Sequence, residues 1–220
     1  MDLSQMLTQA VWPRDGHLKQ LPHFSADMIS KAKQSEVESV FDVLEMEDED
    51  RLALLKLLSE RQMGDVANFC NGYPNVELQY EPVQPEKIDD DDEDSDDSDA
   101  EEPGAKKKKT DDEDDSNKPY VAGVAVQLTR DEEEEDDIVT KVEAPFWPAD
   151  KEQGWWLLVG NVESNHLVSI KRINFVKGTQ ANLNWQVDDA KAGETRKYTL
   201  YFICDSYTGC DQEYEFELKF

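Results

Sequence analysis

The chain has 220 residues, of which 38% are hydrophobic, and a formal net charge of −28. This length allows one or two small domains but not the core of a large enzyme. Because nucleic-acid affinity rests largely on Lys and Arg that neutralise phosphates, the charge argues against a whole chain that coats a phosphate backbone. It argues equally against adsorption to anionic membranes.

The three cysteines, Cys70, Cys204 and Cys210, do not form the paired framework of a small secreted protein. A reducing compartment, the cytosol or the nucleus, is therefore expected. No stretch approaches the roughly 20 apolar residues that span a bilayer. The first residues also lack the basic segment and the long apolar core of a signal peptide.

Residues 1–12 predict an amphipathic helix, because apolar side chains recur at helical spacing: Leu3, Met6, Leu7, Ala10 and Val11. Pro13 should end this helix. A helix of this length is not stable alone in water. Its apolar face therefore needs a partner, which chain upstream could supply, and we expect the sequence to be a fragment.

Residues 22–72 predict four short helices that pack together. Acidic residues 47–50 favour the start of the third helix, and Asn71-Gly72 ends the fourth. The other helix starts carry serine caps: Ser25 for the first, Ser35 with Glu38 for the second, and Ser59 with Gln62 for the fourth. Such helices resemble helix-hairpin-helix modules that bind nucleic-acid backbones. The turn 58–61 lacks their paired glycines, which favours simple packing over RNA contact.

From residue 73 the periodicity changes to two, which is typical of half-buried antiparallel strands. Pro82 and Pro85 should end the first strand. We predict about eight strands, at residues 76–80, 120–128, 138–142, 155–160, 166–174, 181–187, 196–204 and 212–220. The expected fold class is α+β, in which a small helix-loop-helix domain (22–72) precedes an immunoglobulin- or fibronectin-type antiparallel β-sandwich (73–220).

An acidic tract separates the first two predicted strands. Residues 89–99 are almost all Asp, Glu and Ser, and a second acidic run follows the lysines at 106–109. A segment without large apolar side chains cannot offset its ordering entropy by burial. Residues 86–118 are therefore predicted to be a disordered insertion in the sandwich, and such surface insertions cost little stability.

Nothing in the sequence supports catalysis or a cofactor. The glycine-rich cradle of a nucleotide site does not occur, and the acidic box 131–137 has no neighbours suited to Mg²⁺ and phosphate. His17, His23 and His166 pair with no Ser or Cys at a recognisable spacing. We expect the chain not to be an enzyme.

Two groups could bind metal in principle. The carboxylates of Asp205, Asp211 and Glu213 lie near a loop, as Ca²⁺ ligands often do. Asp and Gly in a turn more often bond backbone amides, however. Cys204 and Cys210 lack the further Cys or His that zinc requires. We expect no metal site.

A partner-binding surface is predicted around the pair Trp155-Trp156. On a strand the two rings point to opposite faces, so one is in the core and the other can anchor a partner. The alternative, in which the domain covers both rings, stays open. With the adjoining turn, the predicted contact residues are Trp155, Trp156, Asp205 and Tyr207.

The acidic tract also holds candidate modification and import signals. Ser95, Ser98 and Thr110 lie among acidic residues that suit acidophilic kinases, and phosphate would add negative charge. The lysine run 106–109 is either a nuclear import signal or a counter-charge within the tract.

Nearly the whole chain outside the acidic tract resembles a known family, in residues 18–24, 37–49, 67–75, 154–160, 167–172 and 198–214. It is similar to the C-terminal Sec-sixty-three-type module of the U-five small nuclear ribonucleoprotein RNA helicases, the bad-response-to-refrigeration family. The last stretch is the most specific. In that family a helical bundle, a helix-loop-helix domain and a fibronectin-like sandwich follow a helicase core. The resemblance implies that residues 1–21 are the end of the bundle.

What the resemblance implies is a nuclear, non-catalytic role in pre-mRNA splicing. In the family the first such module braces the active helicase cassette and contacts RNA, whereas the C-terminal module follows an inactive cassette and docks other splicing factors. The expected partners are splicing-factor proteins and the upstream cassette, with weak RNA contact and no membrane or small-molecule substrate. The acidic insertion departs from the family pattern.

Two alternatives stay open. One is the equivalent module of an endoplasmic-reticulum translocation protein or of a transcription-cointegrator helicase. The other is an acidic nuclear chaperone that holds basic proteins with residues 86–118. The sequence does not identify a docking partner.

Overall fold

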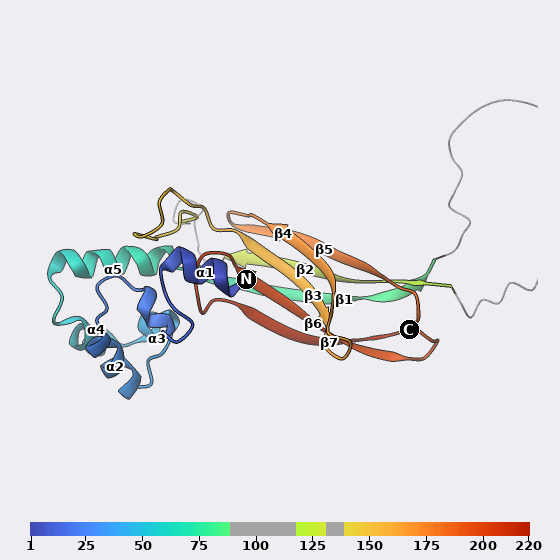
Figure 1. Cartoon of the computed structure of the whole chain (residues 1–220), viewed down its shortest axis with the longest axis horizontal. Helices are drawn as coiled ribbons and strands as arrows, with labels where there is room; N and C mark the ends of the chain where they lie inside the picture. The colour runs from blue at the N-terminus through green and yellow to red at the C-terminus, as the bar shows by residue number, and fades with distance from the viewer. Residues whose placement is uncertain (89–117, 131–138) are drawn as a thin grey trace, which may run out of the picture.

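Helices occupy one end of the molecule and two β-sheets the other (Figure 1). The computed structural model describes residues 1–88, 118–130 and 139–220. The predicted order of helices followed by an antiparallel sandwich is confirmed. The assignment to the immunoglobulin or fibronectin type stays a prediction, as do the domain boundaries.

The helical region consists of six short elements: α1 (Asp2–Gln9), the 3₁₀-helix η1 (His17–Gln20), α2 (Ala26–Gln34), α3 (Val40–Glu45), α4 (Asp48–Leu55) and α5 (Glu60–Gly72). The cap predicted at Ser25 is confirmed, because its side chain accepts from the Met28 amide. The capping box of Ser59 with Gln62 is also confirmed at the start of α5.

The cap predicted at Ser35 is wrong. Ser35 lies at the C-terminal end of α2, and Glu36 after it takes a left-handed conformation with φ of 61°. The next helix begins later, where Ser39 and Asp42 form a reciprocal capping box. The Asp42 carboxylate accepts from both the Glu38 and Ser39 amides at 2.8 Å, and these bonds lower its pKa. Helix α3 therefore has its N-cap at Ser39, four residues after the predicted position.

Two antiparallel sheets form the sandwich. The three-stranded sheet has the order β1 (Val76–Lys87), β2 (Tyr120–Arg130) and β5 (Gly178–Val187). The four-stranded sheet has the order β4 (His166–Ile173), β3 (Trp155–Asn161), β6 (Thr195–Cys204) and β7 (Gln212–Lys219). The inner sides of the sheets face each other across a core of aromatic and aliphatic side chains.

The first strand is longer than predicted, since it continues through Pro82 and Pro85 to Lys87. In the described part of the chain β1 has a single neighbour, β2, so it is an edge strand. A proline on an edge strand need not lose a sheet hydrogen bond, and the register shift between Val83 and Glu86 accommodates the second one. Residues 86 and 87 thus belong to the sheet and not to the insertion.

The strand predicted at 138–142 is wrong over its described residues. Among them, only Lys141 pairs, in an isolated bridge to Glu152. Backbone bonds from Val142 to Lys151 and from Gln153 to Thr140 make a local loop contact in place of a sheet strand. The described chain therefore has seven sandwich strands where about eight were expected.

Aromatic rings fill the sandwich interior. Trp155 stacks on Phe202 of the neighbouring strand, with ring centroids 4.4 Å apart. Across the two sheets, Trp185 packs on Tyr198 at 5.0 Å. These contacts follow from the period-two alternation of β3, β5 and β6, which points every second side chain inward.

Three predictions concern segments outside the described residues: disorder across 89–117, the phosphorylation sites Ser95, Ser98 and Thr110, and the import signal 106–109. Within the described chain, no helix has both the length and the apolar content needed to cross a bilayer.

Candidate functional site at the helix–sandwich junction

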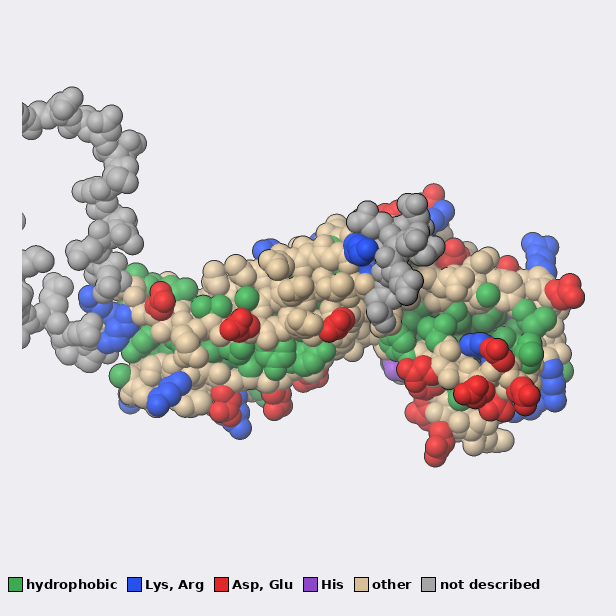
Figure 2. Space-filling view, turned by 180° about the vertical axis from the view of Figure 1, so that it is seen from behind, with side chains coloured by type: hydrophobic (Ala, Val, Ile, Leu, Met, Phe, Trp, Pro, Cys, Tyr) green, Lys and Arg blue, Asp and Glu red, His purple; other side chains and the backbone are tan. Residues whose placement is uncertain are grey.

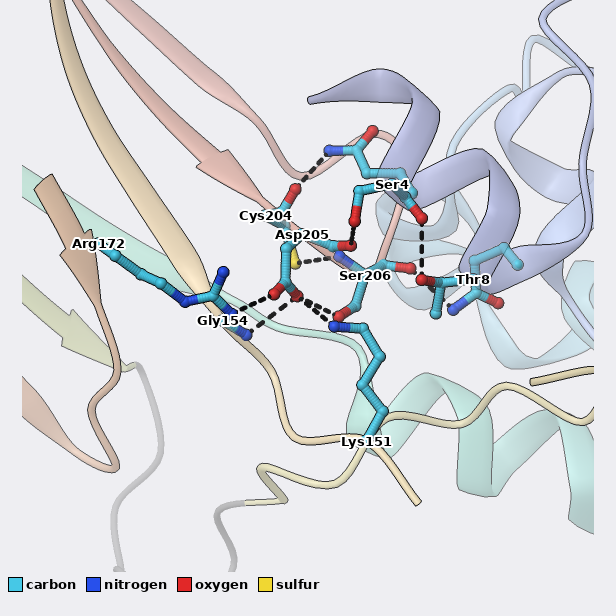
Figure 3. Close-up of polar contacts among 10 residues, drawn as sticks. Ser4, Thr8, Lys151, Gly154, Arg172, Cys204, Asp205 and Ser206 are labelled. Atoms are coloured by element: carbon cyan, nitrogen blue, oxygen red, sulfur yellow. Dashed lines mark hydrogen bonds and ion pairs between the residues drawn. The ribbon is translucent and has the colours of Figure 1, made fainter. Parts of the chain in front are cut away.

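The loop between β6 and β7, residues 205–211, lies where the helices meet the sandwich; we call it the junction loop. Its central residues are almost fully buried, with Asp205 4% exposed and Ser206 and Tyr207 0% exposed. Figure 3 shows α1 lying against this loop, with Lys151, Gly154 and Arg172 converging from the sandwich side. The loop therefore contacts several segments that are distant in sequence.

Helix α1 is fixed to the junction loop by its polar side. The Gln5 amide nitrogen donates to the Cys204 carbonyl at 2.8 Å and to the Asp211 carboxylate at 2.9 and 3.0 Å. Gln9 donates to the Ser206 carbonyl at 3.0 Å, and Ser4 to the Asp205 carbonyl at 2.8 Å. These bonds supply donors to carbonyl and carboxylate groups in and beside the loop.

The apolar side of α1 faces away from the loop. Leu3 is 67% and Leu7 61% exposed, and the packing of this side on an upstream partner stays a prediction. Gln5, Thr8 and Gln9 are the buried positions. The reason is that the loop offers unpaired carbonyl groups, which a polar helix face satisfies and an apolar one cannot.

Gln20 clamps the tip of the junction loop from the 3₁₀-helix. Its amide donates to the Thr208 carbonyl at 2.8 Å and accepts from the Thr208 amide at 3.1 Å. The Tyr73 hydroxyl, at the end of α5, donates to the same carbonyl at 2.8 Å. At Gly209, with φ of 88°, a Cβ would lie 3.0 Å from the His17 ring, so the tip needs glycine.

Tyr207 forms the aromatic centre of the junction. Its ring packs edge-on against Phe69 of α5 at 5.5 Å and against Tyr73, the residue that follows α5, at 5.4 Å. Its hydroxyl accepts from the Glu143 amide at 2.8 Å. The ring thus joins the last turn of α5 to the sandwich.

A fourth buried glutamine, Gln153, connects strand, helix and loop. It accepts from Arg130 at the end of β2 at 2.7 Å. Its own amide donates to the Gly72 carbonyl at 3.0 Å and to the Val139 carbonyl at 3.1 Å. These three bonds use both donors of the side-chain amide and one of its two acceptor sites.

Asp205 is the electrostatic centre of the site. Lys151 lies 3.0 Å and Arg172 2.7 Å from its two carboxylate oxygens, and the Gly154 amide donates to it at 3.1 Å. Burial would raise the pKa of Asp205, but hydrogen bonds from Ser206 and Lys151 outweigh it and hold the pKa below its usual range. A Cβ at Gly154 would lie 2.5 Å from both Asp205 and Arg172, so only glycine permits this approach.

At the other end of the loop the shift in carboxylate pKa is opposite in direction. Asp211 is exposed as a whole residue, yet desolvation of its carboxylate beneath α1 raises its pKa, despite bonds from Gln5 and the Cys204 amide. Burial raises the pKa of the neighbouring Cys210 thiol well above its ordinary value. A buried, protonated thiol is a poor nucleophile.

The carboxylates of the junction loop bond to neighbouring groups of the chain. Within residues 1–88, 118–130 and 139–220, no group of three or more His, Cys, Asp and Glu side chains could hold a metal. Asp205 and Asp211 instead bond backbone amides and neighbouring side chains. His23 pairs with Asp65 at 2.7 Å on the helical surface, far in sequence from the loop.

The four predicted partner-binding residues have different positions. Trp155, Asp205 and Tyr207 are 1%, 4% and 0% exposed, so their side chains pack inside the chain and are unavailable as a contact surface. Trp156 is half-buried on the outer side of β3, with the Arg172 guanidinium 5.0 Å from its ring centre. The prediction that the two indoles point to opposite faces is confirmed, and partner binding by Trp156 stays a prediction.

Sequence reasoning missed the four junction glutamines: Gln5, Gln9, Gln20 and Gln153. Their one sequence signal is the i, i+4 spacing of Gln5 and Gln9, which places both on one helix face. Glutamine is mostly a surface residue, so this spacing predicts a wet face unless the carbonyl groups opposite it are known.

Comparison with known proteins identifies related sequences. The Sec63 Brl domain family matches residues 1–217. U5 small nuclear ribonucleoprotein 200 kDa helicases of Drosophila melanogaster and Homo sapiens are 41% and 42% identical over 219 and 218 residues, 100% and 99% of this chain. An activating signal cointegrator 1 complex subunit 3-like protein of Dictyostelium discoideum is 34% identical over 218 residues, 98% of the chain. The chain spans 8% of the length of each relative.

Proposed function

The chain belongs to the Sec63 Brl domain family, and from this membership we propose that it is a non-catalytic protein-interaction module of a U5 small nuclear ribonucleoprotein helicase. In this role it docks other splicing factors in the nucleus. ATP-dependent unwinding belongs to other regions of such a protein, since this chain corresponds to 8% of the relatives' length.

The junction carries this proposal. Side-chain bonds from α1, η1 and Gln153 converge on the junction loop and on the end of α5, and the ring of Tyr207 packs on Phe69. A docking module gains affinity when its surface is already ordered, because less freedom is lost on binding. The buried polar contacts supply that order without any catalytic group.

Exposed apolar surfaces give the module places to contact partners. Figure 2 shows apolar side chains gathered over the helical end, bordered by acidic ones. Leu52 of α4 and Leu57, two residues beyond its end, are 61% and 66% exposed. Leu3 and Leu7 of α1 and Trp12 after it are exposed as well, and we propose that this side of α1 packs on the upstream helicase cassette. Apolar patches of this kind commonly mark interaction sites.

A second candidate is the same module in a transcription-cointegrator helicase, favoured by the 34% identity to the Dictyostelium protein. The third, an acidic chaperone, draws on the net charge of −28. These readings differ in the partners that the chain should recover, so one purification compares all three.

The test is affinity purification from nuclear extract with two baits, the intact chain and a variant without residues 89–117. Recovery of spliceosomal proteins by both baits is the expected result. Cointegrator subunits in place of splicing factors would favour the second candidate. Basic nuclear proteins recovered by the intact chain alone would favour the chaperone and contradict our proposal.

A further inference from the structure

The outer side of the four-stranded sheet carries a continuous set of apolar side chains. Strand register places them in adjacent cross-strand pairs, Trp156 opposite Ile203 and Leu158 between Ile170 and Tyr201. We call these five residues the apolar strip. Their inward neighbours on β3 and β6 are fully buried, so the strip lies on the opposite, open side of the sheet.

The strip is open to solvent and held in shape. Ile170 is 48% exposed, and the other four are partly buried by one another. The Tyr201 ring lies over Gly160, where a Cβ would meet it at 3.6 Å, and the Arg172 guanidinium covers Trp156 at 5.0 Å. In the described residues no helix packs on this side of the sheet with more than isolated contacts. Large apolar side chains in this setting lose little freedom when a partner covers them.

One border of the strip is acidic. On β7, Glu213 lies opposite Tyr201 and Glu215 opposite Thr199, both on the wet face. Among the described residues neither carboxylate has an ion-pair partner, whereas the next one, Glu217, lies 3.6 Å from Lys197. The cation at the other border, Arg172, is already held by Asp205. The strip therefore presents uncompensated negative charge along one side.

We propose that the apolar strip is the docking face of this module, and that it binds a partner-protein segment in which apolar anchor side chains lie next to Lys or Arg. The apolar anchors cover Trp156, Leu158 and Tyr201, and the cations meet Glu213 and Glu215. This inference rests on the proposed function and deepens it, because it names the surface and the chemistry of the partner. Negative charge beside an apolar surface raises the association rate of basic segments and favours them over acidic ones.

Two other occupants fit less well. A second copy of the chain would bring together surfaces of the same sign in a protein of net charge −28. The chain's own lysines at 106–109 have the right charge, but residues 89–117 contain no large apolar side chain to cover the strip. A partner segment with apolar anchors and with Lys or Arg matches both the apolar strip and its acidic border.

The probe is a phage-displayed library of short random peptides, selected on the intact chain. We expect enriched peptides to combine large apolar residues with Lys or Arg. Their affinity should fall about tenfold or more for Leu158→Ser with Tyr201→Ser, and similarly for Glu213→Lys with Glu215→Lys, which changes only the wet face. Val121→Ser, at a position 41% exposed on the other sheet, is the matched control and should bind as the intact chain does.

Enrichment of peptides without Lys or Arg, or equal binding by the charge-reversed variant, would overturn the proposal. If removal of residues 89–117 raises peptide affinity about tenfold, the chain's own segment occupies the face and the partner assignment is wrong. Purification from nuclear extract distinguishes a failure of the docking face from a failure of the proposed function. Equal recovery of splicing factors by the intact chain and by both variants would reject the face alone, whereas no recovery by the intact chain would reject the proposed function with it.

Discussion

The junction and the sandwich interior are both buried, but different interactions hold them together. The interior is almost entirely apolar, with stacked pairs such as Trp155 and Phe202. Among the residues that the structure describes, all buried polar side chains except Thr199 lie at the junction: Gln5, Thr8, Gln9, Gln20, Arg130, Gln153, Asp205, Ser206 and Thr208. Apolar burial supplies bulk stability and tolerates repacking, whereas hydrogen bonds to defined carbonyls fix position. The molecule thus uses one kind of contact to fold and another to orient its parts.

The largest expected effect comes from the sandwich interior. Trp155→Ala removes a fully buried indole from beside Phe202 and should lower the free energy of unfolding by about 3–5 kcal/mol. Trp156→Ala, the matched change on the outer side of the same strand, should cost about 1 kcal/mol, the size of an exposed cation–π contact with Arg172. Denaturant titration measures both. Equal losses of unfolding free energy in the two variants would contradict the burial of one face of β3 and the exposure of the other.

A junction clamp should cost less but act at a defined place. Gln20→Leu leaves the buried Thr208 amide without its acceptor and should lower the unfolding free energy by about 1–3 kcal/mol. Hydrogen exchange should become faster at the Thr208 amide, while amides of β2 and β5 keep their protection. Gln34→Leu, at an exposed position of α2, is the control. Unchanged exchange at Thr208 would show that the clamp does not order the loop.

The two carboxylates that flank the junction loop should respond oppositely to pH. The folded pKa of Asp205 lies below its ordinary value of 3.8, so its contribution to stability is present above pH 3.8 and lost as pH falls through the folded pKa. The folded pKa of Asp211 lies above 3.8, so its contribution is greatest below pH 3.8 and lost as pH rises through the folded pKa.

Stability measured against pH for Asp205→Asn and Asp211→Asn checks these signs. The first variant should lack part of the loss at acid pH, and the second should lack part of the decline above pH 3.8. If both variants give curves parallel to that of the parent chain, the carboxylates do not titrate differently in the fold.

The smallest expected effect lies in a helix start away from the loop. Ser39→Ala removes the α3 capping box and should cost about 1 kcal/mol. Ser35→Ala, at the end of α2, should change stability by less than about 0.5 kcal/mol. Thermal unfolding of the two variants compares them. A larger loss for Ser35→Ala would support the cap position that the sequence alone had suggested.

The same contrast explains what the sequence could and could not predict. The alternation of residues such as Phe216 and Leu218 is a local property, and it located the seven observed strands, although not the end of the first one. The end of the first strand at Pro82 was wrong because an edge position is a property of the whole sheet. The inward side of α1 could not be predicted, because the carbonyl that Gln5 bonds to belongs to Cys204, at a sequence separation of 199.

Local sequence patterns also predicted only part of the candidate contact surface. Trp155 and Trp156 could be assigned to opposite faces from strand geometry alone. Tyr207 and Asp205 lie in a turn of Asp, Ser and Gly, a composition typical of exposed loops, and nothing local reveals that helices cover them. The apolar strip depends on pairing three strands in register, which no single stretch encodes.

The junction holds helices and sandwich as one unit, and native-state hydrogen exchange in increasing denaturant measures whether they unfold together. We expect the most protected amides of α5 and of β6 to exchange through the same global unfolding, with equal free energies and equal denaturant dependence. In the double variant Gln20→Leu with Gln5→Leu, α5 should open before β6. Separate exchange of α5 in the unmodified chain, at a lower free energy than β6, would show that the two parts are not one unit.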